Sequence, residues 1–222
     1  MSEREGCLLK LDLHVHTVFS GDAIITPREA LAWARKAGLH GLAITDHDTL
    51  AGGLRAAKLA RHYGLLVLPG MELETRGGHV LALCPSEPVE AGSDLAEAVE
   101  AVRDAGGLAI LAHPYDLTAP RRWDARSLAK LDAIEVMNAH SLPFRLSCWL
   151  AEKLARALGK PMTGGSDAHV PEAIGAAYTL VDAEGDVDDV LEAIRKGRTR
   201  PCGRSSGLRC LLKKWAYAGF SR

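Results

Sequence analysis

A run of β-forming residues from 11 to 17 carries two histidines, His14 and His16, at alternate positions. Side chains of a β-strand alternate between its two faces, so both imidazoles are expected to point to the same side. Two imidazoles on one face can bind a single metal ion. Taken alone, the pair is equally compatible with a partly exposed strand that carries two ordinary histidines.

Residues of the same kinds recur where other apolar runs end. Together they form one candidate ligand set: His14, His16, Asp22, His47, Glu72, His79, His113, Asp167 and His169. All are nitrogen or oxygen donors, which suits zinc, manganese or iron at a hydrolytic centre better than a closed structural zinc site. Nine ligands exceed what one ion needs. We therefore predict two or three divalent ions, with a carboxylate bridging a pair of them.

Several of these residue types also have ordinary structural roles. Asp22 lies in a Ser-Gly-Asp turn, where Asp is common, and His79 opens a strand after two glycines. Asp46 and Asp48 flank His47, and one of them is expected only to orient an imidazole. Three further histidines are interpreted as ordinary surface residues: His40, His62 and His140.

Length and composition describe an ordinary globular protein. The 222 residues are enough for one domain with a full core, and the net charge of −1 gives no general reason to expect a polyanionic partner. The five cysteines are odd in number and form no CxxC pair, which indicates a reducing, cytoplasmic location. The N-terminus carries no signal-like apolar segment, and no apolar run approaches the roughly 18 residues that a membrane span needs.

The ligands must be positioned by strands that alternate with helices. We predict strands over residues 8–15, 39–45, 65–68, 79–83, 108–112, 133–137, 161–165 and 176–181. We predict helices over residues 27–37, 52–62, 94–105, 144–158 and 187–195, the first with a capping box at Thr26 and the third with Ser93 as N-cap. Apolar strands between amphipathic helices indicate a parallel sheet covered by helices.

A barrel and an open doubly wound sheet both fit this alternation. Polar residues that can bind metal follow at least six of the strands. A barrel brings all such strand ends to one rim, whereas an open sheet gathers them only near its switch point. The sequence also has no glycine-rich phosphate loop. The barrel is therefore favoured.

These motifs resemble those of the PHP (polymerase and histidinol phosphatase) family. They occur in the family's order over about residues 8–182: Asp12-Leu-His14-Val-His16, Thr45-Asp46-His47-Asp48, His113-Pro114 and Gly165-Ser166-Asp167-Ala-His169. The resemblance implies an α/β fold, a distorted (β/α)7 barrel, with a trinuclear metal site at the C-terminal strand ends.

Carried over by motif, the resemblance implies a role for each ligand. The first ion would be held by His14, His16, Glu72 and Asp167. Glu72 would bridge to a second ion, completed by His79 and His113, and a third ion would be held by Asp22, His47 and His169. We assign the catalytic roles to Glu72 and Asp167.

The resemblance further implies that a metal-bound hydroxide attacks the phosphorus of a phosphate ester. We expect a small phosphorylated substrate, a nucleotide or a short RNA or DNA. Substrate phosphates usually also meet an arginine. The candidates for substrate binding are Asn138, Arg145 and Arg121, with Arg122 beside the last.

Three alternatives stay open. One is a monoesterase of the histidinol phosphatase type. Another is a non-catalytic PHP module that serves a polymerase or another partner. The presence of residues at all nine ligand positions argues against this alternative. The third is hydrolysis of C–N bonds. The lack of a lysine at a predicted strand end that could be carboxylated argues against it. Nothing in the sequence indicates an oligomeric state.

The C-terminal part differs in charge from the rest, so we divide the chain into a barrel at 1–196 and a basic extension at 197–222. Residues 195–222 hold nine Lys or Arg and no Asp or Glu, which leaves 18 basic and 28 acidic residues elsewhere. The extension either binds nucleic acid or packs on the barrel. Packing is favoured because stacking aromatic residues are sparse, and it would use Leu208, Leu211, Leu212 and Trp215. Every candidate ligand lies at or before His169, so we expect no chemistry from the extension.

Overall fold

The computed structural model describes residues 8–90, 92, 94–117, 123–210 and 212–214. The strands are β1 (Leu8–Val15), β2 (Gly41–His47), β3 (Leu66–Glu74), β4 (His79–Leu83), β5 (Leu108–Ala112), β6 (Ala133–Asn138), β7 (Met162–Gly165), β8 (Ala177–Asp182) and β9 (Thr199–Gly203). The helices are α1 (Pro27–Lys36), α2 (Ala51–Tyr63), α3 (Leu95–Asp104), α4 (Ala125–Lys130), α5 (Phe144–Leu158) and α6 (Val187–Arg195). None of these helices is both long and apolar enough to cross a membrane.

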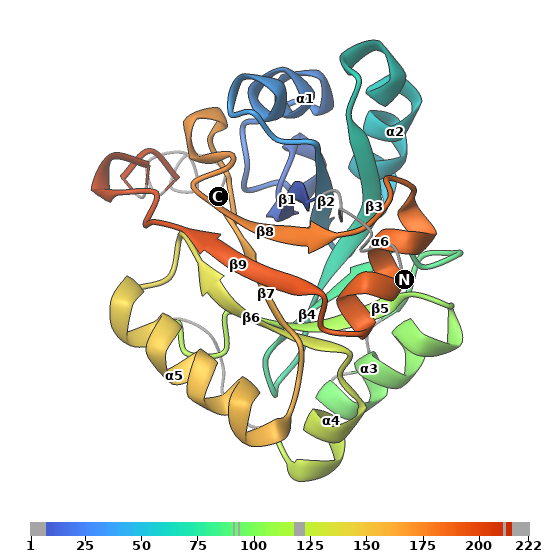
Figure 1. The fold of residues 1–222 in the computed structure, drawn as a ribbon, viewed down its shortest axis with the longest axis vertical. Coiled ribbons are helices and arrows are strands. Elements are labelled where there is room, and N and C mark those ends of the chain that lie inside the picture. Colours follow the sequence, from blue (N-terminus) through green and yellow to red (C-terminus); the bar gives the residue numbers. More distant parts are fainter. Residues whose placement is uncertain (1–7, 91, 93, 118–122, 211, 215–222) are drawn as a thin grey trace, which may run out of the picture.

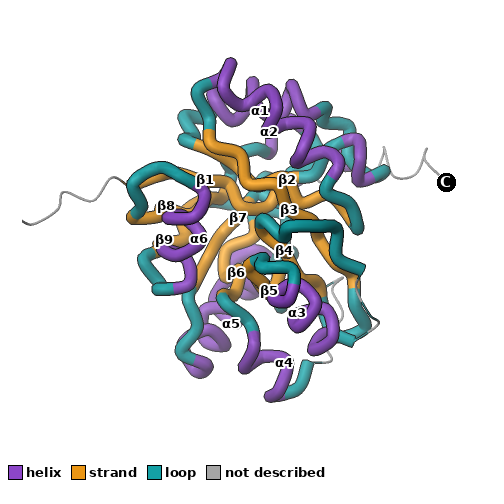
Figure 2. The backbone as a smooth tube through the Cα atoms, turned by 90° about the vertical axis from the view of Figure 1, so that its right-hand side faces the viewer, coloured by secondary structure: helices purple, strands orange, loops and turns teal. Residues whose placement is uncertain are grey.

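All nine strands belong to one sheet in the order β7-β6-β5-β4-β3-β2-β1-β8-β9, and the helices surround it (Figures 1 and 2). The sheet nearly closes on itself because the end of β1 meets the segment after β7. There His16 N donates to Ala168 O at 3.0 Å, and Asp167 N donates to His14 O at 2.8 Å. The predicted α/β fold, a distorted barrel, is confirmed.

The sheet is mixed, so the prediction of a parallel sheet is wrong in part. β4 runs antiparallel to both β3 and β5, and β8 runs antiparallel to β1 and β9. Residues 75–78 join β3 to β4, and so short a connection can make only a hairpin. Thr75 closes it by donating its hydroxyl to Gly78 O at 2.6 Å. The reversal brings His79, the first residue of β4, to the rim where β3 and β5 end.

A bulge between Asp12 and Val15 interrupts the pairing of β1 with β2. On the N-terminal side of the bulge, Leu11 packs into the apolar cluster that β3, β4 and β5 share. His14 lies within the bulge and His16 directly after it, and their Nε2 atoms are 3.1 Å apart. Bulges commonly re-aim side chains beside functional sites, and this one directs both imidazoles to the rim.

Local sequence explains where the helices begin. The predicted capping box of α1 is present, with Thr26 and Glu29 bonded reciprocally. The N-cap of α3 is Asp94, whose carboxylate accepts from Ala96 N, so the assignment of the cap to Ser93 was wrong. The short helix α4 was not predicted, although Asp124 caps it with a clear capping box.

The first residues of the expected extension form β9, which pairs with β8 along its length. Further on, Leu208 and Leu212 are 66% and 53% exposed, so the prediction that they pack on the barrel was wrong. In the same segment, Cys210 is the buried side chain among the described residues 208–210. The other two expected contacts, Leu211 and Trp215, lie outside the described residues. The division of the chain at residue 196 stays a prediction.

Candidate metal centre

Four of the predicted ligands meet at the end of β1. His14 Nε2 and His16 Nε2 lie 3.2 and 3.1 Å from Glu72 Oε2. The same nitrogens lie 3.6 and 3.3 Å from Asp167 Oδ1. Nitrogen and oxygen ligands at roughly 2.0–2.1 Å from a tetrahedral ion stand about 3.3 Å apart. These four side chains therefore fit the first coordination sphere of one ion.

The second oxygen of Glu72 faces a different pair of imidazoles. Glu72 Oε1 lies 2.9 Å from His79 Nδ1 and 3.0 Å from His113 Nε2. The antiparallel register explains this meeting, because His79 pairs with Glu74 on one side and with Ala112 on the other. Glu72 is 1% exposed and turns one oxygen to each cluster, which is the arrangement a bridging carboxylate needs.

A third group of ligands lies on the other side of His16. Asp22 Oδ2 is 2.8 Å from His169 Nε2 and 3.7 Å from His47 Nε2. Together with His16, these residues offer ligand atoms that all lie within 4.8 Å of one another. Asp22 Oδ1 is buried and has no hydrogen-bond partner in the described part of the chain. A buried carboxylate oxygen without a partner fits the place of a cation.

A buried carboxylate that was not predicted from the sequence lies behind the first group. Glu135 is 1% exposed and accepts from His14 Nδ1 at 3.1 Å and from His113 N at 3.0 Å. A carboxylate on one imidazole nitrogen leaves the other nitrogen free to bind metal. The signal was present, because an acidic residue between Ile134 and Val136 in a buried strand needs a partner.

Glu135→Gln is expected to weaken metal binding on the order of 10- to 100-fold, because an amide orients His14 less strongly than a carboxylate does. Competition with a chelating dye measures this affinity. Glu152→Gln is the matched control, since Glu152 lies on α5 and pairs only with the exposed Arg156 among the described residues. Equal affinities in the two variants would show that Glu135 does not support the ligand.

Two other imidazoles are fixed through the nitrogen that points away from the ligand group. His16 Nδ1 lies 2.9 Å from Ser20 Oγ, which also accepts from His47 N at 3.0 Å. His169 Nδ1 donates to Asp167 O at 2.9 Å. The carbonyl of Asp167 sets the tautomer of His169 that presents Nε2 to the ligand group, and the contact with Ser20 orients the ring of His16.

The backbone is strained at two of the candidate ligands. His113 and Asp167 have φ angles of 26° and 52°, in the left-handed region that non-glycine residues rarely adopt. Each such residue costs of order 1–3 kcal/mol and persists only where the surroundings impose it. Two residues before Asp167, a methyl group on Gly165 would meet His14 Cβ at 2.5 Å, so the close approach of β7 to β1 requires glycine there.

The buried carboxylates and imidazoles of the site stabilise each other's charged forms. Burial alone would raise the pKa of Glu72, but His14 and His113 hold it well below its ordinary value. Burial likewise opposes protonation of His14, yet Glu135 and Asp167 raise its pKa well above the usual range. Cations must therefore stand among the carboxylates, either as imidazolium groups or as bound metal.

The pKa of His47 predicts proton release on metal binding. Burial lowers this pKa, but the neighbouring carboxylates of Asp22 and Glu72 raise it to about 9. An imidazole ligand must be neutral, so metal affinity should increase with pH up to about 9, and protons should be released below that pH. Calorimetry in buffers of different ionisation enthalpy measures the release. Heats that are independent of the buffer would contradict the prediction.

Seven of the nine candidate ligands line a pocket of about 210 Å³, and His14 and His16 are not among its lining residues. The predicted substrate residues lie mostly away from its wall. Asn138 is 2% exposed and donates its amide to Glu135 and Asp167, so it supports ligands. Arg145 is exposed in the first turn of α5 and does not line the pocket, and Arg121 lies outside the described residues.

Two interpretations of individual residues were wrong. His140 is not a surface histidine, because it lines the pocket, and its ring centroid lies 5.6 Å from that of His169. Asp46 orients no imidazole. It accepts instead from Thr17 N at 2.5 Å and from the Thr17 hydroxyl, and it thereby fixes the turn after β1. Asp48 is exposed.

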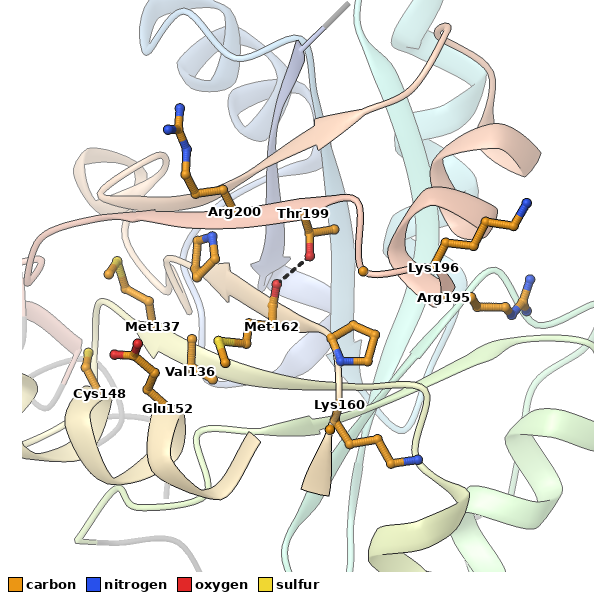
Figure 3. A pocket seen from close by; sticks show the side chains of 14 residues that line it. Val136, Met137, Cys148, Glu152, Lys160, Met162, Arg195, Lys196, Thr199 and Arg200 are labelled. Carbon is orange, nitrogen blue, oxygen red and sulfur yellow. Dashed lines mark hydrogen bonds between the residues drawn. The ribbon is translucent and has the colours of Figure 1, made fainter. Parts of the chain in front are cut away.

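A larger hollow of about 690 Å³ lies between α5, β7 and β9 (Figure 3). Its walls include Met137, Met162 and Pro201, and Glu152 is its one carboxylate among the described residues. None of the nine candidate ligands lines it. The candidate metal ligands therefore lie at the smaller pocket and not at this hollow.

The barrel and the clustered ligands define a class of protein, the metallohydrolases with a metal centre at the strand ends. The sequence matches the PHP domain over residues 12–123 and the PHP-associated region over residues 145–199. The chain therefore belongs to the PHP family, and the predicted class of enzyme, a metal-dependent hydrolase, is confirmed.

Individual proteins are similar to this chain in sequence or fold. The chain is 36% identical to an uncharacterised protein of Methanocaldococcus jannaschii over 60% of its own length and 83% of the relative's. It is 25% identical to a 5′-3′ exoribonuclease of Haemophilus influenzae over 93% of its own length and 85% of the relative's. The fold is similar to that of a proposed metal-dependent phosphoesterase of Bifidobacterium adolescentis, with a TM-score of 0.65 and 24% identity over 87% of this chain and 98% of the other.

Proposed function

We propose that this protein hydrolyses phosphate esters with two or three divalent ions held by the nine candidate ligands. The observation that carries the proposal is the position of Glu72, whose two oxygens face two different groups of imidazoles. Bound zinc, manganese or iron would supply a water of lowered pKa and positive charge beside the phosphate oxygens. The role of Glu72 and Asp167 is to hold that charge at the floor of the pocket.

We further propose a nucleotide or a short oligonucleotide as the substrate. Two observations support this choice. The Haemophilus influenzae relative is named an exoribonuclease, and the two chains match over most of their lengths. The pocket, at about 210 Å³, is also smaller than the roughly 300–1,000 Å³ that encloses a whole small molecule. It suits a phosphate group, with the rest of the substrate lying outside the rim.

A small monoester such as histidinol phosphate is the second candidate, and the same small pocket supports it. The two candidate substrates differ in the group that carries the phosphate, which is a nucleotide in one and a small alcohol in the other. A non-catalytic module is disfavoured because the described residues include a complete set of ligands whose donor atoms converge.

The experiment is a hydrolysis panel on protein reconstituted with zinc or manganese. It compares nucleoside bisphosphates and short 5′-phosphorylated RNA with histidinol phosphate and an aryl phosphate. Higher kcat/KM on the nucleotide substrates is the expected result. A higher value on histidinol phosphate would replace the proposed substrate, and no phosphate release from any compound would overturn the proposed activity.

A further inference from the structure

The C-terminal segment places a lysine in the wall of the metal-ligand pocket. Lys214 Nζ lies 3.9 Å from Asp22 Oδ2, and the side chain is 22% exposed. Among the described residues that line this pocket, it is the one Lys or Arg. The sequence predicted chemistry only from residues up to His169, so the position of Lys214 was not expected.

Lys214 is carried to the pocket by a segment that the barrel holds at several points. After β9, Arg204 N donates to Ala176 O at 2.8 Å, and Ser206 N donates to Ala139 O at 2.8 Å. Cys210 is 8% exposed and belongs to the apolar cluster that α1 and β2 share with the segment after β7. Lys213 pairs with Glu172 on the outside. These contacts fix the direction in which the segment crosses the rim.

The charges around Lys214 indicate what it would bind. The other ionisable groups of the pocket wall are carboxylates and imidazoles: Asp22, His47, Glu72, Glu74, His79, His113, Asp116, His140, Asp167 and His169. Metal ions held by this set would neutralise the carboxylate of Asp22, the nearest partner of Lys214. The ammonium group of Lys214 and the metal ions would then both face the pocket, and an anion between the ammonium group and the ions would be attracted to both.

We propose that Lys214 binds a non-bridging oxygen of the substrate phosphate. A lysine ammonium is a compact charge with three donors and is a common phosphate ligand. The inference rests on the proposed function and names the residue that recognises the phosphate group. Lys214 thus has the role of phosphate binding that was expected of an arginine. The basic extension thus contributes to substrate binding through one side chain inside the pocket.

The test measures binding of inorganic phosphate to the metal-loaded full-length protein by calorimetry. Lys214→Gln is expected to weaken phosphate binding on the order of 10-fold, because a charge-assisted hydrogen bond is lost. Lys214→Arg should stay within a few-fold of the wild type. Arg209→Gln is the matched control, since it removes one charge from an exposed position of the same segment. Melting temperatures of all variants should agree.

Kinetics on an aryl phosphate provide the second readout, where Lys214→Gln should raise KM more than it lowers kcat. Phosphate binding by Lys214→Gln equal to that by Arg209→Gln would overturn the inference, as would a wild type that binds no phosphate. A wild type that binds phosphate through Lys214 but hydrolyses no ester would instead contradict the proposed function alone.

Discussion

Glu72→Gln is expected to lower turnover on the order of 10³-fold, the effect of removing a main electrostatic contributor. One carboxylate oxygen faces His14 and His16, and the other faces His79 and His113. An amide has one oxygen and no negative charge, so it cannot hold two cations close together. Initial rates at saturating zinc or manganese measure the loss.

Glu74→Gln is the matched control for this experiment. Glu74 lies two residues further along β3, on the same pocket, with Oε1 3.5 Å from His47 Nδ1. The Glu74→Gln substitution removes one negative charge from the pocket wall and leaves Glu72 intact. The turnover of this variant should therefore stay within a few-fold of the wild type. Equal losses in Glu72→Gln and Glu74→Gln would show that general pocket charge, and not bridging, is what matters.

Removal of the metals is expected to abolish hydrolysis and to lower the melting temperature on the order of 10 °C. An ion present at roughly 1,000 times its Kd stabilises the folded state by about 4 kcal/mol. In a chain of this size, each kcal/mol changes the melting temperature by about 2–4 °C. Scanning calorimetry before and after chelation measures the change, and added zinc or manganese should reverse it.

The chelated protein also provides an internal control. In the Glu72→Gln variant the difference in melting temperature between loaded and chelated protein should shrink, because fewer ions bind. A wild type with the same melting temperature and activity in both states would contradict a metal centre built from these ligands.

The sequence predicted most of the fold because local signals agreed with the tertiary structure. The strand Leu8–Val15 and the helices Phe144–Leu158 and Val187–Arg195 have the predicted bounds. Alternation of side chains also predicted that His14 and His16 share a face, and their Nε2 atoms lie 3.1 Å apart. The direction of β4 was missed, because strand patterning does not reveal which way a strand runs.

The supporting residues were harder to predict because they act over long sequence separations. Glu135 lies 121 residues from the imidazole of His14 that it orients. Lys214 reaches Asp22 from the far end of the chain, in a segment whose composition suggested only a basic surface. The left-handed backbone at Asp167 depends on how β7 packs against β1, which no local pattern records.

The measurement that tests the central claim most directly is a metal titration of the chelated protein, followed by phosphate release from the best substrate of the panel. Elemental analysis of the same samples gives the number of ions per chain. The multinuclear centre predicts that activity stays near zero up to one equivalent, rises steeply between one and three, and then stays constant. Full activity in protein that holds a single ion per chain, or none, would contradict it.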